Sequence, residues 1–312
     1  MRYLHKSRWQ PLHSGNREVE SLRRSARNVR ESRVPRNTSN PEESHEVSTD
    51  LSGSRWPFCR HYVEIVLVLG LSLGASAVYS IVSITNRLTR PTALGDQTAT
   101  INGALSDRPS FDLIYHLLAI FFDLVPVALC AFLLWQGTGR PFGRLGLDLR
   151  RPLSDLGTGT ILAVAIGAPG IGLYVLGRAL GITVAVSAAP DDWRWYTVPV
   201  LVLSAIRAGV QEEVIVIGYL YARLGDLGWG RWRILMTSAL LRGSYHLYQG
   251  IGPFIGNVIM GVVFGLFYQR FGRTLPLVIA HSIIDTVSFV GYPLAVALWP
   301  ELFAPPSRQN EG

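Results

Sequence analysis

Long apolar runs separated by short polar loops fill the chain from residue 62 onward. Their approximate ranges are 62–85, 112–135, 156–182, 196–224, 231–246, 253–268 and 275–298. Most approach or exceed the ~20 residues that an α-helix needs to cross a bilayer. The pattern therefore predicts an all-α, polytopic membrane helix bundle with about seven transmembrane helices. Pro169-Gly170 is expected to interrupt the third of them.

Composition supports a membrane protein. Of the 312 residues, 48% are hydrophobic and only 16% are charged, whereas soluble domains carry about 25% charged residues. The two cysteines, Cys59 and Cys130, form no CxxC pair, so neither a thiolate metal site nor a disulfide framework is indicated.

Residues 1–61 are polar and arranged in charge blocks. Residues 1–36 hold ten Lys/Arg against three Glu, and residues 37–54 hold four acids and no base. This pattern predicts a disordered, basic cytoplasmic tail. An arm that lies on anionic lipid is the functional alternative.

The distribution of arginine predicts the orientation. The loops at 136–155, 223–233 and 269–274 are basic, and the loop at 183–195 is acidic. The positive-inside rule then places the N-terminus in the cytoplasm of a multi-pass cell-membrane protein. The same rule explains the net charge of +7 without a nucleic-acid partner.

Several ionisable residues fall inside apolar runs, where burial is costly and usually reflects function. They are Glu212, Glu213, His246, His281 and Asp285. Asp123 and Arg207 also lie in such runs, and for them a structural ion pair is the preferred interpretation.

Helical spacing suggests how these groups cooperate. Arg242 and His246 are four residues apart, as are His281 and Asp285, so each pair shares a helix face. We assign a separate catalytic role to each residue. Glu212 is the general base that takes a proton from water. His246 then holds that water or a metal, and His281, oriented by Asp285, completes a metal shell or donates to an oxyanion.

Three motifs together resemble a known family. Glu212-Glu213-x-x-x-x-Gly218, His246 on the next helix and His281-x-x-x-Asp285 follow the order of EExxxR, FxxxH and HxxxN/D. The chain is thus similar, over about residues 196–292, to the CAAX prenyl protease and bacteriocin-processing (CPBP, or Abi) family.

The resemblance implies a CPBP-like protease domain at 196–298, preceded by N-terminal transmembrane helices at 62–182. It implies a glutamate-dependent intramembrane metalloprotease that hydrolyses a membrane-proximal peptide bond, in CAAX-type or small-peptide processing. The catalytic residues would be Glu212, Glu213, His246, His281 and Asp285. A divalent metal, with zinc as one candidate, would be held by His246 and His281. The partners would be the lipid bilayer and a peptide or protein substrate, prenylated or not.

Two positions depart from the motifs. The arginine of EExxxR is Ile217, and the phenylalanine of FxxxH is Arg242. We therefore expect Arg242 to act as a supporting residue that pairs with Glu213 from the neighbouring helix. The loss at Ile217 also suggests an alternative, a catalytically inactive relative that acts as a membrane scaffold or immunity factor. A proton-coupled transporter is a third interpretation, but no internal repeat supports it.

Overall fold

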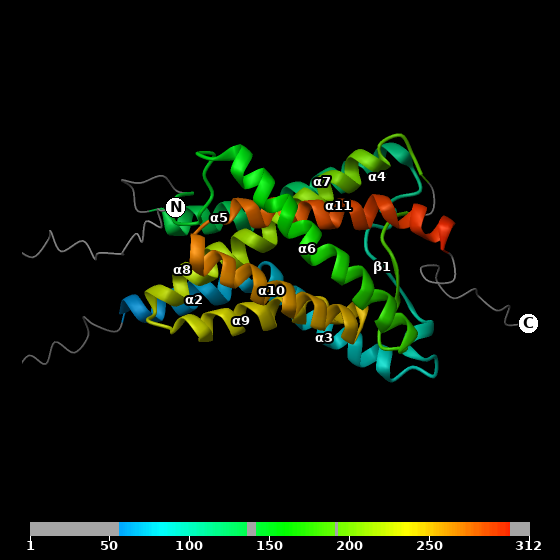
Figure 1. Cartoon of the computed structure of the whole chain (residues 1–312), viewed down its shortest axis with the longest axis horizontal. Helices are drawn as coiled ribbons and strands as arrows, with labels where there is room; N and C mark the ends of the chain where they lie inside the picture. The colour runs from blue at the N-terminus through cyan, green and yellow to red at the C-terminus, as the bar shows by residue number, and fades with distance from the viewer. Residues whose placement is uncertain (1–55, 136–141, 191–192, 300–312) are drawn as a thin grey trace, which may run out of the picture. The chain divides into compact units, whose positions relative to one another are not determined.

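The structure, a computed structural model, describes residues 56–135, 142–190 and 193–299. All of them belong to one compact unit that is mostly helical (Figure 1). The predicted tail lies outside the described residues as far as residue 55. Residues 56–61, which the prediction included in the tail, are the first residues of a helix.

The first predicted helix is two helices, α2 (Trp56–Gly70) and α3 (Leu73–Leu88), which meet at a 56° bend. The Ser72 hydroxyl donates to the Val68 carbonyl at 2.6 Å, a back-bond that often bends helices. A bent pair of this kind is either a broken span or a re-entrant segment.

The second predicted helix is also divided, into α4 (Pro109–Asp123) and α5 (Val125–Leu134). Pro126 lies in the first turn of α5 and has no N–H for a helical hydrogen bond. The opposite holds for α6 (Pro152–Ala179), which continues through Pro169 where an interruption was expected.

The C-terminal half contains the predicted apolar helices with some changes in detail. The elements are α7 (Thr197–Glu212), the π-helix η2 (Glu213–Tyr219), α8 (Leu220–Asp226), α9 (Arg231–Ser244), the 3₁₀-helix η3 (Leu247–Gln249), α10 (Ile251–Phe271) and α11 (Leu275–Leu298). The predicted helix at 196–224 is therefore three consecutive helical segments.

The structure contains a small sheet that the all-α prediction did not include. Strand β1 (Thr98–Thr100), which follows the 3₁₀-helix η1 (Leu94–Asp96), pairs in parallel with β2 (Ala185–Ser187). The Val184 N–H donates to the Gln249 carbonyl at 3.0 Å, and the Ile251 N–H donates to the Ile182 carbonyl at 2.9 Å. The loops before α4, before α7 and before α10 are thus joined at one end of the helices, and we call them the cap.

The basic loops are joined at the other end. Arg144 contacts Asp226 at 2.8 Å, and the Thr274 N–H donates to the Gly146 carbonyl at 3.0 Å. The Arg273 guanidinium contacts Asp148 at 3.2 Å. The loops before α6, α9 and α11 therefore lie at the same end of the helices. This agrees with the prediction that these basic loops face the same side of the membrane.

Among the described residues, the chain runs seven times between these two ends. The passes are α2 with α3, α4 with α5, α6, α7 to α8, α9, α10 and α11. By length and hydropathy alone, three described helical stretches could cross a membrane, or up to four if the bent pair is one span. Seven membrane spans therefore remain a prediction.

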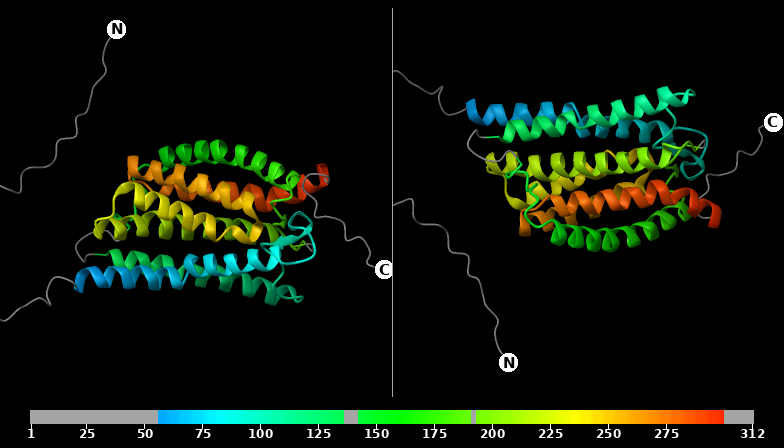
Figure 2. Two further views of the ribbon diagram at one scale, coloured as in Figure 1. Left: turned by 90° about the horizontal axis from the view of Figure 1, so that it is seen from below. Right: turned by 90° about the horizontal axis from the view of Figure 1, so that it is seen from above.

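Three layers of helices are visible in Figure 2. Helix α6 covers one side and packs on α10 and α11, while α2, α3, α4 and α5 lie on the opposite side. Helices α7, α9, α10 and α11 occupy the space between them. The helices that carry the candidate site are therefore the inner ones.

Glycines bring these inner helices close together. A Cβ on Gly209 of α7 would lie 2.5 Å from the Ser282 hydroxyl and 3.0 Å from the Val278 carbonyl of α11. A Cβ on Gly261 of α10 would lie 2.8 Å from the Ala239 backbone of α9. Such close packing at small residues is typical of membrane helices.

Candidate active site

The two glutamates lie where α7 becomes a π-helix. Glu212 is the last residue of α7 and Glu213 is the first of η2. Short π-helical segments are rare and often occur at functional sites. Their shifted hydrogen bonding leaves backbone groups that need other partners, and the Ser238 hydroxyl of α9 donates to the Val216 carbonyl at 2.9 Å. Both glutamates are buried, and Glu213 is fully inaccessible.

Glu213 is held by two neighbours. Nη2 of Arg242 lies 2.7 Å from each of its carboxylate oxygens, and Nδ1 of His281 lies 2.6 Å from Oε1. Because an ionised carboxylate only accepts hydrogen bonds, Nδ1 of His281 is the donor. Glu213 therefore has a buried cation as its counter-charge and fixes the orientation of the imidazole.

Nε2 of His281 consequently faces the remaining acids. It lies 3.5 Å from Oδ2 of Asp285, one turn later on α11, and 3.9 Å from Oε2 of Glu212. This arrangement reproduces the predicted pairing of His281 with Asp285. It also makes His281 the side chain that lies between the two glutamates.

Glu212 is surrounded more loosely than Glu213. The Tyr245 hydroxyl donates to its Oε2 at 2.7 Å. Nη1 of Arg242 lies 3.6 Å from the same oxygen, and Nε2 of His246 lies 3.8 Å from it. The last two separations are longer than hydrogen bonds and suit a bridging water.

The two ring nitrogens of His246 are buried and have no hydrogen-bond partner among the described residues. Buried polar atoms normally have a partner in the protein or in bound water. Since Nε2 faces Oε2 of Glu212, the space between them is the best place in this site to bind a water molecule.

The predicted helix position of His246 needs a correction. Helix α9 ends at Ser244, and His246 lies in the following turn, with φ −101° and ψ −1°. Arg242 and His246 nevertheless both approach Glu212, as their shared face predicted. Tyr245, the C-cap residue of α9, contacts the same carboxylate.

The donors do not fit a divalent metal as they are arranged. In the described parts of the chain, no group of three or more His, Cys, Asp or Glu side chains is placed to hold one. Oε2 of Glu212 already accepts from Tyr245 and lies near the Arg242 guanidinium. A cation at that oxygen would therefore face a positive charge, and the metal predicted on His246 and His281 enters no step of the mechanism below.

Sequence reasoning missed Tyr245. An aromatic residue with a polar tip next to a candidate histidine is a weak pattern, because tyrosines are common in membrane helices.

The structure also contains the expected structural pair: Nη1 of Arg207 lies 3.3 Å from Oδ2 of Asp123.

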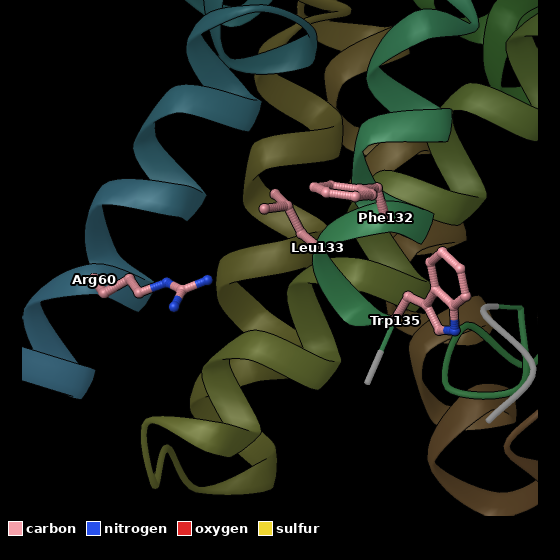
Figure 3. Close-up of a pocket in the computed structure, with 4 residues that line it drawn as sticks. All are labelled: Arg60, Phe132, Leu133 and Trp135. Carbon is pink, nitrogen blue, oxygen red and sulfur yellow. The ribbon is translucent and has the colours of Figure 1, made fainter. Parts of the chain in front are cut away.

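A second group of charged residues lies at the end with the basic loops. Arg223 of α8 contacts Glu64 of α2 at 3.0 Å and donates to the Leu133 carbonyl of α5 at 2.5 Å. Beside it is a pocket lined by Arg60, Phe132, Leu133 and Trp135 (Figure 3). None of these residues contacts the two glutamates of the candidate site, and the ion pair attaches α2 to α8.

The comparisons with known proteins agree with the motifs. Residues 193–287 match a family model described as "Type II CAAX prenyl endopeptidase Rce1-like". Comparisons with curated proteins and with solved structures gave no match. The matched segment contains Glu212, Glu213, Arg242, Tyr245, His246, His281 and Asp285. Residues 193–287 are therefore an Rce1-like domain, of the CAAX protease family that the sequence motifs indicated.

Proposed function

We propose that this domain is an intramembrane endopeptidase that hydrolyses a membrane-proximal peptide bond with water activated by Glu212. The observation that carries the proposal is the difference between the two adjacent glutamates. Glu213 is neutralised by Arg242 at 2.7 Å. Oε2 of Glu212 lies 3.8 Å from His246, an imidazole whose ring nitrogens have no partner among the described residues.

In the proposed reaction, a water held by Glu212 and His246 attacks the carbonyl carbon of the scissile bond. Glu212 takes a proton from that water as general base. The C–N bond of the tetrahedral intermediate then breaks, and the proton passes from Glu212 to the departing amine. Each proton removed from water is thus returned to a product.

His281 is proposed to stabilise the oxyanion. Its Nδ1–H is engaged by Glu213, so Nε2 is the nitrogen that remains for the substrate. A ring protonated on both nitrogens would donate from Nε2 to the oxyanion, beside the carboxylate of Asp285 at 3.5 Å. Loss of one oxyanion donor typically lowers kcat about 10²–10³-fold.

The substrate class follows from the family and the surroundings. The family description names CAAX prenyl endopeptidases, and the site lies among apolar helices. We propose a membrane-tethered peptide or protein substrate cleaved near the bilayer, as in CAAX-type or small-peptide processing. A prenyl group on that substrate is part of this proposal and is open to direct test.

The alternative of an inactive scaffold or immunity factor was based on Ile217. In this structure Glu213 has a guanidinium partner although residue 217 is not arginine. This contact supports activity, because the motif substitution does not leave the second glutamate unpaired.

A cleavage assay tests the proposal. Purified wild-type protein in lipid would be mixed with a membrane-tethered reporter that carries a prenylated or an unmodified C-terminus. We expect Glu212→Gln to lower the cleavage rate about 10²-fold or more. Asp123→Asn, which changes an acid on another helix, is the matched control. Equal cleavage by wild type and purified Glu212→Gln protein would refute the assignment.

A further inference from the structure

Two consecutive side chains, Tyr245 and His246, point at the same carboxylate oxygen. Consecutive residues of an α-helix diverge by about 100° and do not face one target. Here the Tyr245 hydroxyl lies 2.7 Å from Oε2 of Glu212, and Nε2 of His246 lies 3.8 Å from it. Their ring centroids are 4.8 Å apart, with the planes inclined at 45°.

The end of α9 produces this convergence. Tyr245 is the C-cap residue, with φ −79° and ψ 0°, and His246 follows in a turn. This turn is fixed from two directions. The Tyr248 N–H donates to the Ser80 hydroxyl of α3 at 2.7 Å, and the Gln249 carbonyl accepts from Val184 of the cap. Tyr245 is therefore placed by the fold and not by its own contact with Glu212.

Arg242 is a potential ion-pair partner of Glu212, in competition with the contacts to Tyr245 and His246. Its Nη2 is bonded to Glu213, but its Nη1 is buried and has no hydrogen-bond partner among the described residues. That free Nη1 lies 3.6 Å from Oε2 of Glu212, so a small rotation of the carboxylate would form a second ion pair. A carboxylate bound to a buried guanidinium is stabilised as an anion and is a weaker proton acceptor.

We infer that Tyr245 is the positioning residue of Glu212, which keeps this carboxylate toward His246 and away from Arg242. The hydroxyl donates to Oε2 and thereby satisfies the oxygen without neutralising the charge. Glu213 is paired with the Arg242 cation, whereas Glu212 accepts a hydrogen bond from the neutral Tyr245 hydroxyl. The inference rests on the proposed function, since it assigns Tyr245 a role in holding the base of that reaction.

The test compares Tyr245→Phe with Tyr248→Phe. The first removes only the hydroxyl that contacts Glu212. The second removes a hydroxyl of the same region that accepts from Gln249. We expect Tyr245→Phe to lower kcat by about 10²-fold, the scale of a small misplacement of a reacting group, with KM changed less than about 3-fold. Its Tm should fall no further than that of Tyr248→Phe, because Glu212 gains Arg242 as a partner.

A thermal double-mutant cycle provides a readout that needs no activity. If Arg242 captures Glu212 when the hydroxyl is lost, then Glu212→Gln should lower Tm more in the Tyr245→Phe background than in wild type. Equal Tm changes in the two backgrounds would overturn the inference, even in a preparation that cleaves nothing. Full kcat in Tyr245→Phe, or a loss of kcat matched by a large fall in Tm, would also overturn it. Absence of any Glu212-dependent cleavage by wild type would instead refute the proposed function.

Discussion

Nη2 of Arg242 lies 2.7 Å from both carboxylate oxygens of Glu213, and neither side chain is accessible to solvent. The two residues come from different helices, α9 and the π-helix η2. Removal of one member of a buried ion pair leaves the other charge without compensation. This contact is therefore a structural requirement for holding the two glutamates in an apolar bundle.

The first prediction concerns Arg242. Replacement by Phe, the residue of the family motif, should destabilise the protein by about 3–5 kcal/mol, because Glu213 would be buried and unpaired. Restoring the motif arginine with Ile217→Arg should recover part of that loss in the double variant, since residue 217 lies about one turn after Glu213 on the same helix face. Thermal unfolding and reporter cleavage would both be measured.

The control for this exchange is Ile217→Arg alone. Ile217 is fully buried in the main hydrophobic cluster, so a second guanidinium there should destabilise the wild-type background. The exchange is supported only if the double variant is more stable than either single variant. A double variant no better than Arg242→Phe would show that the arginine cannot act from position 217.

Much of the arrangement was predictable from the sequence. Apolar runs located the helices, and the order of the three motifs identified the residues that meet at the site. The contact between Arg242 and Glu213 was expected, because a buried carboxylate without its motif arginine needs another cation and Arg242 shares a helix face with His246.

The details that were missed depend on specific hydrogen bonds and not on hydropathy. A period of apolar residues does not reveal the π-helix at Glu213 or the bend at Ser72, because both arise from local hydrogen bonding. Nor does it reveal that α9 ends at Ser244 or that the Tyr245 hydroxyl contacts Glu212. The seven passes also differ in length and hydropathy. Several of their helices are shorter than a bilayer requires, so the hydropathy pattern does not establish seven membrane spans.

The second prediction concerns acid stability. Asp148 accepts from the Arg150 N–H at 3.0 Å and contacts Arg273 at 3.2 Å. These contacts hold the pKa of the Asp148 carboxyl below its usual value. A lowered pKa in the folded state contributes stability above the unfolded pKa, and that contribution disappears as pH falls through the folded pKa. Wild type should therefore have a higher Tm than Asp148→Asn at pH 7, with the difference shrinking below about pH 4.

Arg273 also contacts Asp155 of α6, which places this cluster at the start of α11 and hence upstream of His281. Asp107→Asn, which changes an exposed acid at the cap end, is the control variant. A Tm difference for Asp148→Asn that stays constant as the pH is lowered from about 4 to about 2 would contradict the prediction.

The third prediction concerns topology. The basic loops are bonded together at one end of the helices, and the cap occupies the other. By the positive-inside rule, the basic end faces the cytoplasm. In a chain with both native cysteines replaced by alanine, Arg150→Cys should react with an impermeant maleimide only from the cytoplasmic side. Asp107→Cys should react only from outside. Labelling of both from the same side would be incompatible with this arrangement.

The fourth prediction concerns metal. A catalytic zinc site usually has three protein ligands and one open position. Here no group of three or more His, Cys, Asp or Glu side chains among the described residues is placed to hold one, and Oε2 of Glu212 accepts from Tyr245 while lying 3.6 Å from Arg242. Protein purified in mild detergent should therefore contain less than one equivalent of any divalent metal by elemental analysis, and chelators should leave its cleavage rate unchanged. His246→Ala and His281→Ala should not alter the metal content. One equivalent of metal in wild type that is lost in both variants would show that the two histidines bind it, and would require Arg242 to move away from Glu212.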